Sequence, residues 1–197
     1  MDKTQNPNKI EANLNFGMST AKQQHCVIQP QILPNLLDHY QKKETGDNHA
    51  SVVIGALMGT TDGNIIDISN SFHLTLKIAK TEENKKEQEY IFDTEYLKKM
   101  VKFYTQVNNL EKVLGVYIST TKLDKLGMII VHYFARLFND KIVKSPLKLP
   151  IIMLFDPELS NNKLEIKVSQ FAVLTRLGAE HPLADLQRLP SLQWASF

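Results

Sequence analysis

Apolar and polar positions along this chain follow the patterns of strands separated by helices. The nearly continuous apolar run over 51–59 is typical of a strand covered on both faces. Asp62-Gly63-Asn64 comes next and supplies the turn residues of a β-hairpin into a second strand over 65–72. Further strands are expected over 27–29, 113–119, 150–155 and 163–171.

Three stretches carry apolar residues at helical spacing. The first opens at Pro30, because the fixed φ of proline suits a first turn, and it ends before the polar stretch 42–49. The others are expected over 93–107 and 124–138. Strands separated by helices of these lengths predict an α/β or α+β sandwich around a mixed sheet.

The second helix carries more apolar residues than one buried face needs. Asp93 or Thr94 can cap it, and seven apolar or aromatic residues lie from Tyr96 to Val107. A surface helix normally shows polar groups over its other half, so the surplus suggests a second contact surface. A helix sandwiched more deeply in its own domain explains the pattern equally well.

Polar composition marks the segments outside the expected core. Residues 1–24 are rich in Asn, Gln and Lys and are expected to form a disordered tail. The run 77–89 is almost wholly charged or polar, which predicts a solvated loop. One domain is therefore expected over 25–172, followed by a C-terminal tail over 173–197 that packs on the domain, docks on a partner or is disordered.

Composition narrows the possible functions. The net charge is +2, with 23 Lys and Arg against 21 Asp and Glu, so no global field favours nucleic acid. The single Cys26 cannot form an internal disulfide and is expected to be a buried, inert thiol. Apolar runs are too short for a signal-peptide core or for the ~20 residues of a membrane span. A soluble, cytoplasmic protein is expected.

Two strand sequences carry a family resemblance. Residues 51–59 and 113–120 resemble the framework strands of the MPN (JAMM) domain family, and the similarity extends over about residues 25 to 171. The resemblance implies an α/β sandwich of the cytidine-deaminase-like type, in which helices cover a mixed sheet.

Catalytic members of that family hold zinc with two His and an Asp and activate water with a Glu. Counted by the same spacing, the Glu position here is Val52 and the His positions are Ile118 and Thr120, while Ser and Asp become Met128 and Val131. Valine and isoleucine have no lone pair to offer, and a threonine hydroxyl is a poor zinc ligand. The sequence therefore predicts no catalytic residue, no metal and no cofactor, and so no enzyme.

The resemblance also suggests a role. Within the family, the blocks 53–62 and 68–72 are similar to the f subunits of eukaryotic translation initiation factor 3, and 93–100 is similar to the non-catalytic proteasome-lid branch. It implies a scaffold subunit that pairs with a second MPN subunit, sits with other initiation factor 3 subunits near the small ribosomal subunit, and takes no small-molecule substrate. The partner-facing residues proposed from helical spacing are Tyr96, Met100 and Phe103, with Leu97, Val101 and Tyr104 toward the core.

Other interpretations stay open from the sequence. The chain could belong to the proteasome lid or the signalosome instead of initiation factor 3. A metal-dependent isopeptidase with displaced ligands is a second class. An RNA-binding module is a third, motivated by Lys141, Lys144 and Lys148.

Overall fold

The computed structural model describes residues 10–14, 24–43, 52–80, 88–140, 142–159, 164–170 and 195–196. Within them lie three helices: α1 (Ile32–Gln41), α2 (Thr94–Val107) and α3 (Lys125–Asn139). The strands are β1 (Ile10–Leu14), β2 (Gln24–Ile28), β3 (Ile54–Asp62), β4 (Ile65–Leu74), β5 (Leu76–Lys80), β6 (Gln88–Phe92), β7 (Lys112–Ile118), β8 (Ile151–Phe155), β9 (Ile166–Gln170) and β10 (Ala195–Ser196).

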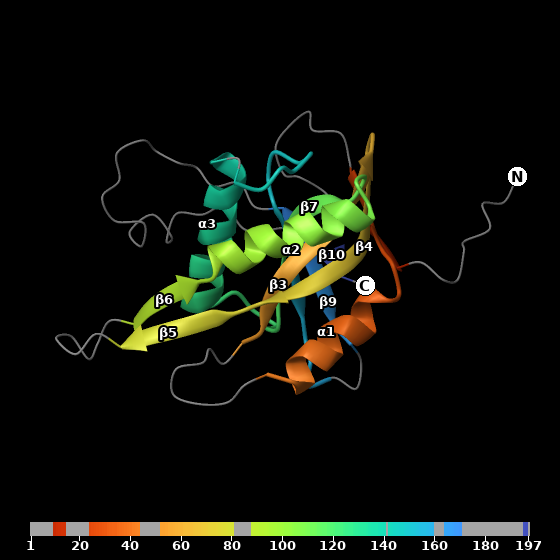
Figure 1. Ribbon diagram of the computed structural model, residues 1–197. Coiled ribbons are helices and arrows are strands. Elements are labelled where there is room, and N and C mark those ends of the chain that lie inside the picture. Colours follow the sequence, from red (N-terminus) through yellow and green to blue (C-terminus); the bar gives the residue numbers. More distant parts are fainter. Residues whose placement is uncertain are drawn as a thin grey trace, which may run out of the picture.

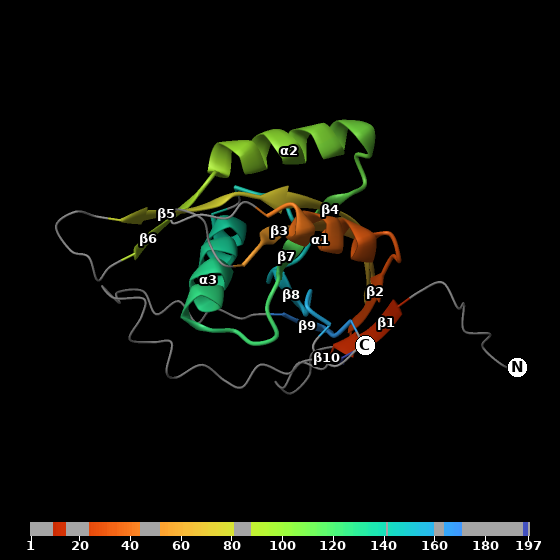
Figure 2. The same ribbon diagram turned by 90° about the horizontal axis from the view of Figure 1, so that it is seen from below.

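Eight strands form one mixed sheet in the order β1-β2-β4-β3-β7-β8-β9-β10. The β2–β4 and β7–β8 pairs are parallel and the other pairs are antiparallel. Helix α1 packs on one face, whereas α2 and α3 pack on the other (Figures 1 and 2). This arrangement confirms the expected α/β fold, and the three helices and the β3–β4 hairpin lie close to where the sequence placed them.

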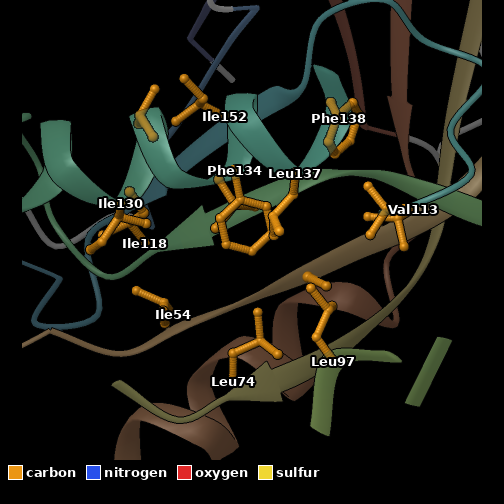
Figure 3. Packing of buried hydrophobic residues seen from close by; sticks show 14 of the residues in the cluster. Ile54, Leu74, Leu97, Val113, Ile118, Ile130, Phe134, Leu137, Phe138 and Ile152 are labelled. Atoms are coloured by element: carbon orange, nitrogen blue, oxygen red, sulfur yellow. The ribbon is translucent and has the colours of Figure 1, made fainter. Parts of the chain in front are cut away.

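The central strand β3 is buried on both faces, as its apolar run predicted. Ile54, Ala56 and Met58 point toward α2 and α3, while Val53 and Leu57 pack in the cluster that contains α1. Figure 3 shows the first cluster, where side chains of α3 meet those of the sheet. Because side chains alternate across a strand, one sequence run supplies both cores.

Residues 76–80 and 88–92 correct the prediction of a solvated loop. They form an antiparallel ribbon, β5–β6, which projects from the sheet (Figure 1). Phe92 at its base stacks on Tyr133 of α3, with ring centroids 3.9 Å apart. Backbone pairing and this aromatic contact stabilise β5 and β6, which the polar composition of the segment did not predict. Residues 81–87 lie outside the described part.

The polar N-terminal segment also contains a strand. Residues 10–14 pair with β2 in antiparallel register, so the expectation of a wholly disordered tail is wrong there. Pairing with a strand edge satisfies backbone groups whatever the side-chain composition. The domain boundaries at 25 and 172 remain a prediction, because residues 15–23 and 171–194 are outside the described part.

Two expectations about the chain's chemistry can be compared with the fold. Cys26 is buried in β2, and burial raises the pKa of its thiol to about 12, which keeps it protonated. None of the helices in the described ranges has the length and apolar composition that a membrane span requires.

Gly115 is required where β7 meets β8, because a Cβ atom there would lie 1.9 Å from the carbonyl oxygen of Ile151. We expect Gly115→Ala to lower the free energy of unfolding by about 2–3 kcal/mol, since the two strands must separate. Urea denaturation followed by circular dichroism measures the change. Gly63→Ala is the matched control, because Gly63 has φ +57° with open space around it and should lose only about 1 kcal/mol. Equal losses in the two variants would contradict the steric explanation.

Candidate functional site

Four of the five positions that correspond to catalytic residues form part of a packed apolar core here, and Thr120 is the exception. Ile118 at the end of β7 and Val131 on α3 are fully buried, and Val52 and Met128 pack against the same cluster. Figure 3 shows Ile118 beside Ile130 of α3, on the same side of the sheet as Ile54. The sequence spacing therefore identified residues that do come together, and what they form is hydrophobic packing.

The polar groups nearest to these positions already have local roles. The Thr120 hydroxyl donates to the carbonyl oxygen of Lys122 at 2.8 Å, within the turn that leads to α3. The Asp124 carboxylate accepts the amide of Gly127 at 2.8 Å and caps α3. The Ser119 hydroxyl oxygen accepts the Val53 amide at 2.8 Å. These groups fix the loop between β7 and α3.

The donor set does not fit a zinc ion. Zinc in proteins takes nitrogen and sulfur ligands from His and Cys or oxygen from carboxylates, in sets of three or four. No group of three or more such side chains is suitably placed anywhere in the described ranges. Two of the described histidines, His39 and His73, are hydrogen-bonded to tyrosines instead.

The three residues proposed to face a partner lie in different surroundings on α2. Phe103 is 59% exposed. Met100 is half-buried and packs against the core, and the Tyr96 hydroxyl is hydrogen-bonded to Nε2 of His73 at 3.0 Å. On the other side of the helix Leu97 is buried, and Val101 and Tyr104 pack against the same core cluster.

The exposed apolar surface continues past Phe103. Val107, one turn further, is 89% exposed, and Leu110, just beyond the helix, is 72% exposed. We call Phe103, Val107 and Leu110 the α2 outer surface. Sequence spacing could have included Val107, which follows Phe103 by four residues, but Leu110 lies after the helix end and gave no periodic signal. Lys144 and Lys148 are exposed between α3 and β8, and Lys141 is outside the described part.

A cleft of about 670 Å³ lies on the other side of α2, between α1 and α2 and along the end of β4. His39 of α1 is hydrogen-bonded through Nδ1 to the Tyr117 hydroxyl at 2.8 Å, and its ring lies 5.4 Å from that of His73. Sequence reasoning missed this cleft, because its residues come from five separate segments and no motif joins them.

Burial controls the protonation of the cleft residues. The pKa of His39 is lowered from 6.5 to about 4, chiefly by desolvation and also by the nearby His73, while Asp38 opposes the shift. Burial also raises the pKa of Tyr117. At neutral pH His39 is therefore uncharged and the Tyr117 hydroxyl is protonated, and the imidazole tautomer decides which of the two donates in their hydrogen bond.

Residues 21–138 match the model of the JAB1/Mov34/MPN/PAD-1 ubiquitin protease family. The match covers more than half of the chain. The chain belongs to this MPN family. The family model overlies β2 to α3, and thus includes both framework strands and the apolar positions at Val52, Ile118 and Val131.

Curated MPN relatives come from two kinds of assembly. The chain is 32% identical over 124 residues to the F subunit of eukaryotic translation initiation factor 3 of Neurospora crassa, covering 62% of this chain and 31% of that protein. It is 29% identical over 109 residues to the 26S proteasome regulatory subunit rpn-8 of the same organism, covering 55% and 30%. For RPN8 of Saccharomyces cerevisiae the identity is 31% over 96 residues, covering 49% and 27%. The matched region is thus about a third of each relative's length.

In this MPN-family chain, Gly55 allows the Tyr117 side chain to cross β3. A Cβ atom at Gly55 would lie 2.3 Å from the Tyr117 ring and hydroxyl. The crossing carries the hydroxyl to His39, so a glycine in one framework strand determines the contact between the other framework strand and α1.

We expect acid to destabilise the fold through His39. Because its pKa is lower in the folded state, the unfolded chain takes up the proton first, and the free energy of unfolding falls as the pH drops from 6.5 to about 4. In His39→Gln this contribution is absent, so stability should decline less steeply over that range. Urea midpoints of both proteins at several pH values measure the difference. Parallel pH profiles would show that His39 is not shifted.

Proposed function

We propose that this chain is a non-catalytic scaffold subunit of eukaryotic translation initiation factor 3, located in the cytoplasm. It pairs with a second MPN subunit and supports recruitment of mRNA and the small ribosomal subunit. The observation that carries the non-catalytic role is the apolar packing of Ile118 and Val131, where catalysis would need imidazole and carboxylate. The similarity to the F subunit of initiation factor 3, over 62% of the chain, supports the choice of assembly.

Converting these positions to ligands would be energetically costly. Ile118 and Val131 have no exposed surface, and an unpaired polar group in such surroundings costs about 1–3 kcal/mol in proteins. The core would have to open to admit both water and a substrate backbone. Apolar residues there stabilise the contact between β7 and α3 instead.

The α2 outer surface supports a role in protein assembly. Phe103, Val107 and Leu110 expose aromatic and aliphatic side chains at and just beyond the C-terminal end of α2, and they remain exposed in the described part of the chain. Exposed apolar residues gathered in one region are typical of protein–protein contacts. A second MPN chain is the proposed occupant.

A second candidate is a subunit of the proteasome lid. The similarity to the 26S proteasome regulatory subunits of Neurospora crassa and Saccharomyces cerevisiae, at 29% and 31% identity, favours it. Both candidates share the scaffold role and differ in the assembly with which the chain copurifies.

Affinity purification of the tagged chain from its own cells, followed by mass spectrometry, tests the assembly. We expect initiation factor 3 subunits, including one with an MPN domain, together with small ribosomal subunits. In Phe103→Asp the MPN partner should be lost, because an aspartate cannot be desolvated in an apolar interface. Recovery of proteasome-lid or signalosome subunits alone would refute the initiation factor assignment.

Lys102→Asp is the matched control for this variant. Lys102 is exposed on the same helix, about 100° around its axis from Phe103, so the same residue introduced there should leave the partner bound. Thermal melting of both variants shows whether each remains folded. Loss of the partner in both, or in neither, would place the interface elsewhere.

Zinc content and isopeptidase activity test the non-catalytic role. Protein incubated with excess zinc and then desalted should hold far less than one zinc per chain, because the described residues provide no suitable ligand set. Cleavage of ubiquitin chains should not exceed the buffer rate. One retained zinc per chain together with cleavage would reverse the proposal.

A further inference from the structure

The second half of β4 has a free edge. Strand β2 pairs with β4 only from Ile65 to Ile68. On the opposite side, β3 stays paired with β4 as far as Leu74. From Ser69 to Leu74, therefore, no strand in the described ranges pairs with the side of β4 that faces away from β3.

Backbone directions show which groups this edge presents. The carbonyl oxygen of Val53 accepts the amide of Ser119 at 3.0 Å, so the backbone polar groups of Val53 face β7. Successive residues of a strand direct their backbone amides and carbonyls to opposite edges. The backbone groups of Ile54 and Ala56 therefore face β4. Their register partners are Leu74 and Phe72, and these bond to β3.

The intervening residues of β4 consequently direct their amides and carbonyls outward. They are Ser71 and His73. Side-chain contacts agree: the Tyr104 hydroxyl donates to the carbonyl oxygen of Ser71 at 3.4 Å, and Nε2 of Gln31 donates to that of Ser69 at 2.6 Å. The Tyr104 contact is long, and the Ser71 amide donates to Oδ1 of the neighbouring Asn70 at 3.2 Å. A bound strand would therefore replace these two weak contacts at Ser71, and it would pair with His73 without displacing any backbone hydrogen bond.

The cleft between α1 and α2 follows this edge. Six consecutive residues, 71–76, line it, and a strand of that length spans about 20 Å. Figure 1 shows β4 running between α2 and α1, one helix on either side. The walls of the cleft are His39 on α1, Lys43 just after α1, and Met100 and Tyr104 on α2. This edge is exposed at His73 and buried at Ser71, and a strand edge at the floor of a cleft suits an extended peptide.

The charges along the cleft favour an acidic occupant. Among the described residues that line it, Asp38 is the only acid, and Lys42 neutralises it at 2.8 Å. Lys43 lines the cleft as well, with its ammonium over the Tyr40 ring. The cleft also has apolar lining residues, which are Met100, Leu74 and Leu76. Because side chains alternate along a strand, those on one side of a bound segment can meet this apolar lining and those on the other side can meet Lys43.

We infer that this cleft binds an extended, acidic segment of a partner protein, which adds as a strand to the free edge of β4 at Ser71 and His73. The backbone of the segment pairs with these two residues, its acidic side chains approach Lys43, and its apolar side chains approach Met100. This binding goes beyond the scaffold role and does not use the α2 outer surface. Its failure would leave the proposed assembly untouched.

The test uses the full chain and a short fluorescent peptide in which valine alternates with glutamate. We expect saturable binding by fluorescence anisotropy, together with about tenfold or greater slowing of hydrogen exchange at the His73 amide. A peptide with N-methylated alternate amides should not bind, because it cannot pair with a strand. The peptide with lysine in place of glutamate should bind more weakly.

Two substitutions at one position separate backbone pairing from side-chain contact. His73→Pro removes the outward amide at an edge position that tolerates proline, and it should reduce affinity at least tenfold. His73→Ser keeps that amide and should bind nearly as well. Lys43→Glu should weaken binding of the acidic peptide about threefold to fivefold, as for a partly exposed ion pair.

Three results would overturn the inference: no binding up to about 1 mM peptide, equal binding of the N-methylated peptide, or unchanged affinity in His73→Pro. The N-methylated peptide acts on wild-type protein, so the test stands even where His73→Pro does not fold.

Discussion

The pairing of β3 with β7 at the centre of the sheet is the constraint on which the rest of the structure depends. Both strands are buried on both faces, and their ends are held together where Ser119 bonds to Val53 through its amide and its hydroxyl. A strand that is buried on both faces cannot contain a polar group without a hydrogen-bond partner. The pairing of β3 with β7 therefore limits which residue types can lie at the ends of these two strands. It places Ile118 against α3 and, through the Gly55 gap, Tyr117 against α1.

The same constraint governs the packing between β7 and α3. In a catalytic MPN protein the strand end and α3 must enclose a polar, hydrated site; here the same elements close on one another through apolar side chains. Burying an aliphatic side chain contributes about 1.5–3 kcal/mol. At the end of β7, therefore, the MPN framework is combined with an apolar contact to α3.

Regular patterns in the sequence predicted the parts of the fold that depend on local periodicity. The apolar run of β3 and the starts of α2 and α3, near Asp93 and Asp124, lie where residue types and spacing placed them. The β5–β6 ribbon and β1 did not follow from side-chain composition, because backbone pairing with a neighbouring strand forms them. The metal-ligand positions followed from motif spacing. The cleft did not, since His39, His73 and Tyr117 lie far apart in the chain and only the tertiary fold joins them.

Cys26 gives the molecule a reporter of its own motions. It is the only sulfhydryl in the chain, it has no exposed surface in β2, and its protonated state makes it unreactive in the native fold. An alkylating reagent can modify it only after β2 leaves its neighbours β1 and β4. The labelling rate thus measures how often this side of the sheet opens, without any engineered probe.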